Sequence, residues 1–218
     1  MQDFMEIGPI MIPIHWVYWG LSSIAGYVMI VWRLQGASLH KKKLIDTIMN
    51  GFIIAFISWK FSYLLLHPVY AFSNPISILY FDGGAKGVVI GLFTATFYVA
   101  YQSFKQNISY GIYLELIFVG LLGWSVIYHF LHMWSDLTYN ILQVMVGLSL
   151  LTYLYKYKIG QYKIISTFII IFCMIQILFQ YFTNSVSFLF HLTLWQFIYL
   201  LVILIILFVP SKGGKFHR

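Results

Sequence analysis

Seven apolar stretches, each long enough to cross a bilayer, constrain the fold of this chain more than any other feature. A membrane-spanning helix needs about 20 mostly apolar residues. The sequence supplies such stretches at 10–32, 44–66, 84–104, 109–131, 137–156, 161–182 and 189–210. Of the 218 residues, 61% are hydrophobic and only 9% are charged. We therefore expect an all-α integral membrane protein with about seven transmembrane helices, in which residues 1–218 form a single transmembrane domain.

The positive charges predict how these spans are oriented. Lys and Arg are concentrated in the cytoplasmic loops of membrane proteins. With the N-terminus outside and the C-terminus in the cytoplasm, 11 of the 13 Lys and Arg fall on the cytoplasmic side. These are Arg33, Lys41, Lys42, Lys43, Lys105, Lys156, Lys158, Lys163, Lys212, Lys215 and Arg218. Topology and contact with anionic lipid thus explain the net charge of +7, and we expect no nucleic-acid partner.

Histidines gather near the expected outer ends of the spans, at His15, His67, His129, His132 and His191. Histidine is common at the membrane interface, where an apolar ring meets water. A working role for His15, His129 or His132 as a general base is the alternative. His129 and His132 share a helix face at spacing i, i+3, but no carboxylate or thiolate pair accompanies them. We therefore expect neither a metal site nor another cofactor.

Lys60 and Glu115 are charged residues that fall well inside the expected spans rather than at their ends. A charge at the middle of the bilayer costs about 2.5–3.5 kcal/mol on insertion scales. Lys60 is therefore expected to face a polar cavity or a carboxylate, and Asp82 is its best candidate partner. Snorkelling of Lys60 to the outer interface is the alternative. Glu115 lies about two turns inside the fourth span and has no obvious partner in the sequence.

The segment 74–91 carries much of the remaining polar chemistry. Gly83, Gly87 and Gly91 recur every four residues and predict a smooth ridge on which another helix packs. The GxxxxGK[ST] order of a nucleotide phosphate loop is absent. A further hypothesis is that the start of the third span binds a lipid phosphate through its backbone N–H groups. The lipid-binding residues are then Lys60, Asp82, Gly83, Gly84, Lys86 and Gly87.

Several motifs along the chain occur in the order found in the bacterial prolipoprotein diacylglyceryl transferases. They are Ile7-Gly8-Pro9-Ile10 with Ile14-His15-Trp16, Trp59-Lys60-Phe61-Ser62-Tyr63, the segment from Asn74 to Gly91, Gln176-Ile177-Leu178-Phe179-Gln180 and Leu194-Trp195-Gln196. The chain thus resembles that family along most of its length. The resemblance implies a shared fold, a place in the bacterial cytoplasmic membrane and a role in lipoprotein biosynthesis. The family transfers a diacylglyceryl group from phosphatidylglycerol to the lipobox cysteine of an exported preprotein.

The residues that carry the family's chemistry differ in this chain. Lys86 stands where the family has a histidine, Lys60 replaces an arginine, and Gln176 and Gln180 replace an arginine and a carboxylate. Lysine and glutamine do not reproduce the bidentate fork that arginine offers to phosphate.

Two functions therefore remain open from the resemblance. One is a glyceryl- or acyl-type transferase with altered chemistry, with Lys86, His15, His129 and His132 as candidate catalytic residues. The other is a non-catalytic module that binds an anionic phospholipid such as phosphatidylglycerol, or a lipoprotein, and serves an exported or membrane partner. A transporter is a weaker alternative, because no pair of broken helices with inverted symmetry is found.

Overall fold

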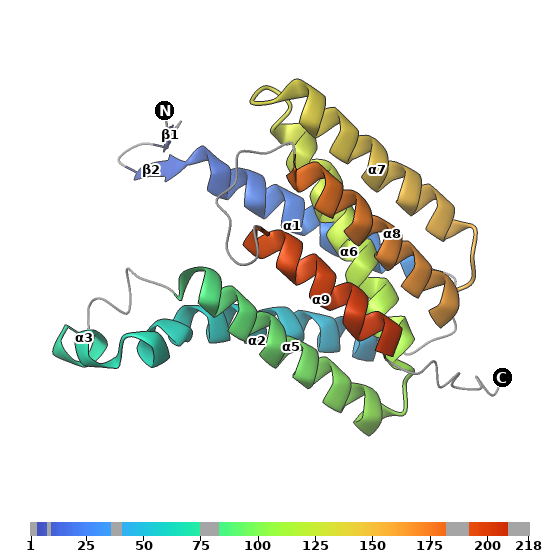
Figure 1. Ribbon diagram of the computed structural model, residues 1–218, viewed down its shortest axis with the longest axis horizontal. Helices are drawn as coiled ribbons and strands as arrows, with labels where there is room; N and C mark the ends of the chain where they lie inside the picture. The colour runs from blue at the N-terminus through green and yellow to red at the C-terminus, as the bar shows by residue number, and fades with distance from the viewer. Residues whose placement is uncertain (1–3, 8–9, 36–40, 75–82, 182–191, 209–218) are drawn as a thin grey trace.

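The chain is a multi-pass membrane protein built almost entirely from helices (Figure 1). The computed structural model describes residues 4–7, 10–35, 41–74, 83–181 and 192–208. Within these ranges, six helices are long and apolar enough to cross a membrane. They are α1 (Ile14–Arg33), α2 (Lys41–Leu66), α5 (Gly84–Gln106), α6 (Tyr110–Leu131), α7 (Leu137–Tyr155) and α8 (Tyr162–Gln180). The seventh predicted span contains a shorter apolar helix, α9 (Leu194–Phe208), of 15 described residues.

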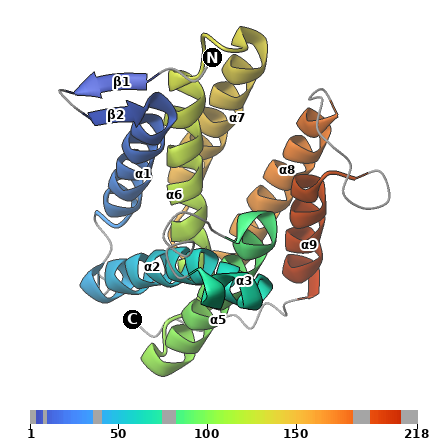
Figure 2. The ribbon, with the colours of Figure 1, turned by 90° about the vertical axis from the view of Figure 1, so that its left-hand side faces the viewer.

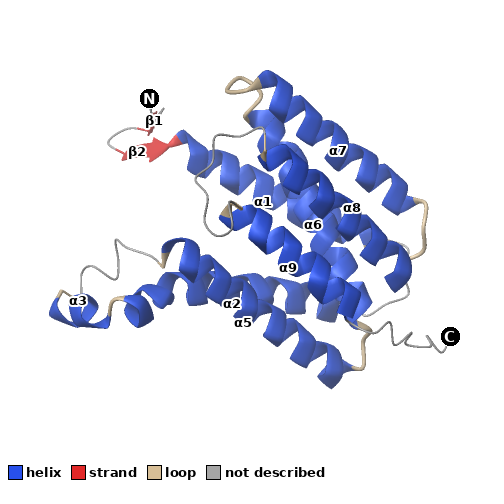
Figure 3. Ribbon diagram, viewed as in Figure 1, coloured by secondary structure: helices blue, strands red, loops and turns tan. Residues whose placement is uncertain are grey.

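The beginning of the chain differs from the expectation of a helix from residue 10. Phe4–Ile7 (β1) and Ile10–Pro13 (β2) pair as an antiparallel hairpin, and α1 begins directly afterwards (Figure 3). Proline disfavours the helical conformation in the residue before it, which explains why the helix starts only after Pro13. A short helix not predicted from the sequence, α3 (Pro68–Ser73), follows α2.

Successive long helices run in opposite directions, as the spans of a multi-pass protein must. Figure 1 shows that α1, α5, α7 and α9 begin at the end of the molecule where α2, α6 and α8 finish. We call this the histidine end, because the described histidines His15, His67, His129 and His132 lie there. The opposite, lysine end carries Lys41, Lys42, Lys43, Lys105, Lys156, Lys158 and Lys163.

Helix α6 is the centre of a five-helix bundle with α1, α7, α8 and α9, and is the most buried of the six candidate spans. Helix α1 packs closely on it, since a Cβ atom placed on Gly26 would lie 2.7 Å from the carbonyl oxygen of Gly120. In a membrane, helices associate through such close van der Waals packing rather than through the hydrophobic effect. The other side of α6 joins an apolar cluster of Phe118, Val119, Leu122, Leu150, Leu151, Leu154, Ile165, Ile169, Cys173, Ile203 and Ile206.

Helices α2 and α5 form a separate hairpin beside this bundle (Figure 2). The predicted ridge of Gly83, Gly87 and Gly91 makes the contact, because Cβ atoms on these glycines would meet atoms of Ser62, Trp59 and Ala55 in α2. A Cβ atom on Gly91 would lie only 2.6 Å from the carbonyl oxygen of Ala55. The interpretation of the glycine ridge as a helix-packing surface is therefore confirmed.

The hairpin joins the bundle at the lysine end. There a buried apolar cluster, which we call the base cluster, combines residues from the end of α1, the start of α2, the last third of α5 and the start of α6. Its members are Ile30, Leu34, Leu44, Ile48, Val99, Ile112, Tyr113 and Leu116. The fold therefore consists of two helix groups, the bundle and the hairpin, which share the base cluster at the lysine end.

Substitution of Gly91 by valine should destabilise the protein by about 1–3 kcal/mol, because the new side chain must push the α2 backbone away. The matched control is Gly20→Val on α1, where nothing lies within 4 Å of an added Cβ atom. Thermal unfolding in detergent micelles compares the two variants. An equal loss of stability in both would show that the α2–α5 contact does not depend on the glycine.

Candidate functional site

The first candidate site is the corner where α2 meets the start of α5, which we call the lysine–glycine corner. Gly83, the residue before α5, is buried and donates its N–H to the carbonyl oxygen of Trp59 at 3.3 Å. Lys60 directly follows Trp59 and is half-buried, whereas Lys86 directly precedes Gly87 and is exposed. The positive end of the α5 dipole and two cationic side chains thus belong to the same corner, an arrangement that favours an anion.

Glycine at position 84 is required by the backbone of this corner. Gly84 has φ of +54°, in the left-handed region, and nothing lies within 4 Å of where its Cβ atom would be. Gly83 and Gly87 are required for a different reason, because added Cβ atoms there would overlap the hydroxyl of Ser62. The glycines therefore shape the first turn of α5 against α2.

Trp59 holds an unusual polar atom within this corner. Its indole Nε1–H is buried and has no hydrogen-bond partner in the described part of the chain. The neighbouring ring atom Cδ1 lies against the first turn of α5, 3.1 Å from where a Cβ atom on Gly87 would be. A buried donor without an acceptor costs about 1–3 kcal/mol, so an oxygen brought within hydrogen-bond distance of this N–H would stabilise the corner.

The second candidate site is a cluster of histidines and aromatic rings on α1, α6 and α7. His132, which follows the last turn of α6, packs against Tyr18 and Tyr128 with ring centroids 5.0 and 4.2 Å away. One of its ring nitrogens, Nδ1, lies 2.9 Å from the carbonyl oxygen of Tyr128. His129 Nδ1 lies 2.8 Å from Oδ1 of Asn140 in α7. His15 is exposed at the start of α1, with its ring against Trp16.

Buried amide side chains extend this polar cluster from α7 to α8 and α9. Gln143 and Gln176 are both buried and donate to each other's side-chain oxygens at 3.0 and 2.7 Å. Gln143 also donates to the hydroxyl of Tyr139 at 3.1 Å. Gln196 is buried at the start of α9, where it and Thr193 form a reciprocal capping box. Such pairing satisfies polar groups that lipid cannot solvate.

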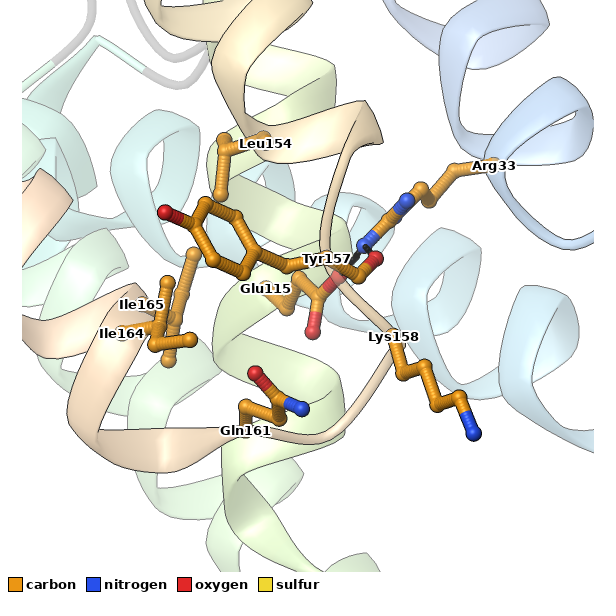
Figure 4. Close-up of a pocket in the computed structure, with 8 residues that line it drawn as sticks. All are labelled: Arg33, Glu115, Leu154, Tyr157, Lys158, Gln161, Ile164 and Ile165. Carbon is orange, nitrogen blue, oxygen red and sulfur yellow. Dashed lines mark hydrogen bonds and ion pairs between the residues drawn. The ribbon is translucent and has the colours of Figure 1, made fainter.

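The lysine end contains a buried ion pair between Arg33 and Glu115 (Figure 4). The Nε and Nη2 atoms of Arg33 both donate to Oε1 of Glu115, Nε at 2.9 Å, and the two side chains are 6% and 3% exposed. Nη2 also donates to the carbonyl oxygen of Tyr157, while Oε2 of Glu115 accepts the N–H of Gly160 at 2.8 Å. The pair thus fastens the α7–α8 turn to α1 and α6.

This ion pair corrects two expectations from the sequence. Glu115, for which the sequence shows no obvious partner, has one in Arg33, and Arg33 is a buried residue rather than a free charge of a cytoplasmic loop. Gly160 has φ of +90°, a conformation that other residues rarely adopt, and this turn directs its N–H toward Glu115. Both charges lie near the expected cytoplasmic face of the membrane, Arg33 at the end of the first span and Glu115 near the start of the fourth. This shared position is the feature of the sequence that could have indicated the pair.

The predicted site residues fall into separate helix groups. Lys60, Gly83, Gly84, Lys86 and Gly87 share the lysine–glycine corner of the hairpin. The candidate bases His15, His129 and His132 belong to the bundle. Asp82 and His191, the remaining predicted residues, lie outside the described residues. Sequence reasoning missed Trp59, Asn140 and Gln143, although a lone glutamine in the apolar span 137–156 is itself a signal of a buried polar contact.

Within the described ranges, no three His, Cys, Asp or Glu side chains gather closely enough to hold a metal ion. The corner combines two lysines with the N-terminus of a helix, an arrangement that favours an anion, and the histidine–amide cluster is held together by hydrogen bonds. Comparison of the chain with protein-family models, with curated proteins and with solved structures gives no match. The relationship to diacylglyceryl transferases stays a prediction from the resemblance.

Loss of one partner from the ion pair should be far more costly than loss of both charges. Arg33→Met leaves a buried carboxylate without its cation and should destabilise the protein by about 3 kcal/mol or more. The double variant Arg33→Met, Glu115→Gln keeps an acceptor for Gly160 and should recover part of that loss. Thermal unfolding in detergent, together with trypsin cleavage at Lys156 and Lys158, measures both effects.

The single variant Glu115→Gln completes a double-mutant cycle. If the effects of Arg33→Met and Glu115→Gln simply add in the double variant, the two side chains do not interact directly. Lys163→Met is a suitable control for the loss of one positive charge, because this exposed lysine lies at the same end of the molecule. It should change the unfolding temperature very little.

Proposed function

We propose that the protein is a membrane-embedded module that binds an anionic phospholipid, such as phosphatidylglycerol, at the lysine–glycine corner and serves a lipoprotein or another exported partner. The observation that carries this proposal is the buried indole N–H of Trp59, which has no acceptor among the described residues. A phosphate or ester oxygen supplies that acceptor, while Lys60, Lys86 and the positive end of α5 balance the phosphate charge.

The distribution of charge supports an orientation with the histidine end outside and the lysine end in the cytoplasm. Apart from Lys60 and Lys86, every Lys within the described ranges lies at the lysine end. With α9 as a seventh span, the N-terminus is then outside and the C-terminus is cytoplasmic. We place the protein in a bacterial cytoplasmic membrane, where the corner faces the outer leaflet.

Binding is favoured over group transfer because the predicted lipid-binding lysines and the predicted catalytic histidines lie in different helix groups. A transferase needs a base beside the reacting group, yet His129 and His132 belong to the bundle and the lysines to the hairpin. One ring nitrogen of each histidine also lies within hydrogen-bond distance of an oxygen, in Asn140 and in the backbone of Tyr128. Lys86 itself is exposed, so burial does not prepare it for the role of a general base.

Removal of the cationic and indole donors should weaken phosphatidylglycerol binding. For the variants Lys60→Met, Lys86→Met and Trp59→Phe combined in one protein, we expect roughly tenfold or greater loss of retained lipid, because charge-assisted hydrogen bonds contribute strongly to binding. Native mass spectrometry from detergent compares retention of phosphatidylglycerol with that of phosphatidylethanolamine.

The matched control removes two lysines from the opposite end, with Lys43→Met and Lys105→Met, both exposed in the wild type. These changes should leave retention unaltered if the corner is the site. Equal retention by the corner variant and the wild type would remove this lipid site from consideration. Equal losses in the corner and control variants would indicate a general effect of charge instead.

The proposed orientation predicts which loops an impermeant reagent reaches in intact cells. Trp134, in the turn between α6 and α7, is 98% exposed, so a cysteine at this position should react with an impermeant maleimide from outside. Cysteine in place of exposed Lys105 should react only after the membrane is permeabilised. Both variants carry Cys173→Ala, which removes the protein's one native thiol. The reverse labelling pattern would invert the topology.

A further inference from the structure

Helix α2 presents an amide to the lipid that surrounds the protein. Asn50 is exposed, and its side chain makes no hydrogen bond within the described part of the chain. At a rise of about 1.5 Å per residue, Asn50 lies about 10 Å deeper than Lys43, whose charge belongs at the level of the lipid headgroups. Hydrocarbon does not solvate an amide, and a short asparagine does not reach the surface as a lysine does. The position of Asn50 therefore calls for a hydrogen-bonding partner.

Exposed hydroxyl groups on other spans are satisfied by their own helix. Ser23 of α1 donates to the carbonyl oxygen of Trp19 at 2.8 Å, and Thr96 of α5 donates to that of Leu92 at 2.7 Å. Serine and threonine can bond in this way to a carbonyl oxygen one turn earlier, so a lipid-facing surface tolerates them. The amide of Asn50 differs from these hydroxyl groups because its own helix does not satisfy it.

Asn50 belongs to a row of exposed residues that runs along α2 on the side opposite its contact with α5. We call this row the α2 stripe, and its members are Lys43, Asp46, Asn50, Ile53 and Ile57. Their spacing alternates between three and four residues, which is the repeat of about 3.5 residues found in helices that wrap around each other. Gly51 and Ala55, which contact α5, lie on the other side of the helix. The α2 stripe thus has the pattern of a helix-pairing surface.

The α2 stripe is chemically complementary to itself. An asparagine amide carries both donors and an acceptor, so the Asn50 side chains of two copies can bond to each other. Two copies in one membrane share an orientation, and a twofold axis along the membrane normal places the two amides at the same depth. Lys43 lies one turn before Asp46 on the same face, so each copy brings both signs of charge to the headgroup level. These charges complement those of a second copy.

We propose that α2 is the contact helix of a homodimer, in which the α2 stripes of two copies pack in parallel and their Asn50 amides bond across the twofold axis. Ile53 and Ile57, 52% and 47% exposed, supply apolar contacts along the same stripe. Apolar side chains alone distinguish poorly between lipid and a second helix, so the amide pair provides the specificity. A single asparagine at such a position fixes register and helix number in coiled coils. The inference is independent of the lipid site proposed above.

Disulfide cross-linking of the full-length protein in membranes locates the contact. Ile53→Cys places a thiol on the α2 stripe, and Phe52→Cys places one at nearly the same depth on a different face; both residues are exposed in the wild type. Each variant also carries Cys173→Ala, so that the introduced thiol is the only one in the chain. On oxidation, we expect Ile53→Cys to give a linked species of twice the chain mass of 25.5 kDa. Phe52→Cys should give far less of it.

Removal of the amide tests what holds the two copies together. Asn50→Leu should raise the dissociation constant of the dimer roughly 3- to 30-fold, as expected for the loss of a hydrogen bond between membrane helices. Energy transfer between fluorescently labelled copies in phosphatidylcholine vesicles, at several ratios of protein to lipid, measures this constant. Asn50→Gln keeps an amide and should lose less affinity. Ser23→Leu, which removes an exposed polar group from α1, should leave the association unchanged.

Three results would overturn the dimer. The first is cross-linking of Ile53→Cys no stronger than that of Phe52→Cys. The second is association of Asn50→Leu as tight as that of the wild type, or a loss of equal size in Ser23→Leu. The third is a linked species of any mass other than twice that of the chain, because the α2 stripe would then bind a different membrane protein.

Discussion

The buried pair of Arg33 and Glu115 is the interaction on which the lysine end of the fold depends. Two charges removed from water are costly, and their attraction offsets that cost only when the remaining hydrogen-bonding groups are also satisfied. Here the backbone of Tyr157 and Gly160 completes the arrangement. Because the pair joins the end of α1, the start of α6 and the α7–α8 turn, it holds these three elements together at the lysine end of the bundle.

The histidine end is held by weaker and more local interactions. Its polar contacts join amides and histidine rings, such as Gln143 with Gln176 and His129 with Asn140. Neutral hydrogen bonds between membrane helices contribute about 0.6 kcal/mol on average, well below the cost of breaking a buried ion pair. The histidines and the proposed lipid site therefore lie at the end of the molecule that is held by the weaker interactions.

The helical spans could be predicted from the sequence because a segment that lies in the hydrocarbon of the membrane must be apolar over about 20 residues, and hydropathy measures this directly. The spans predicted at 44–66 and 109–131 correspond to α2 and α6, and glycine spacing correctly indicated the α5 ridge. Hydropathy gives the depth of a residue but not its neighbours. The contact of α1 with α6 and the pairing of Gln143 with Gln176 therefore had to come from the structure.

The candidate site was predictable only in its residue types. Lys60, Lys86 and the glycines stood out as polar or small residues in apolar surroundings, and the structure places them in one corner. Trp59 did not stand out, because a tryptophan near a helix end is ordinary in membrane proteins until its N–H is found buried without an acceptor. Lipid recognition by this corner stays a prediction.

The distance between Arg33 and Glu115 along the chain has a consequence for biosynthesis. Arg33 is made 82 residues before its partner, so at ordinary rates of translation about 4–16 s pass before Glu115 exists. During that interval the α2–α5 hairpin is made, while α1 has no α6 on which to pack. A long, flexible arginine at the end of a helix can wait with its charge at the membrane surface. The arrival of α6 then draws this arginine into the protein, so the last-made member of the pair determines when the first span reaches its final place.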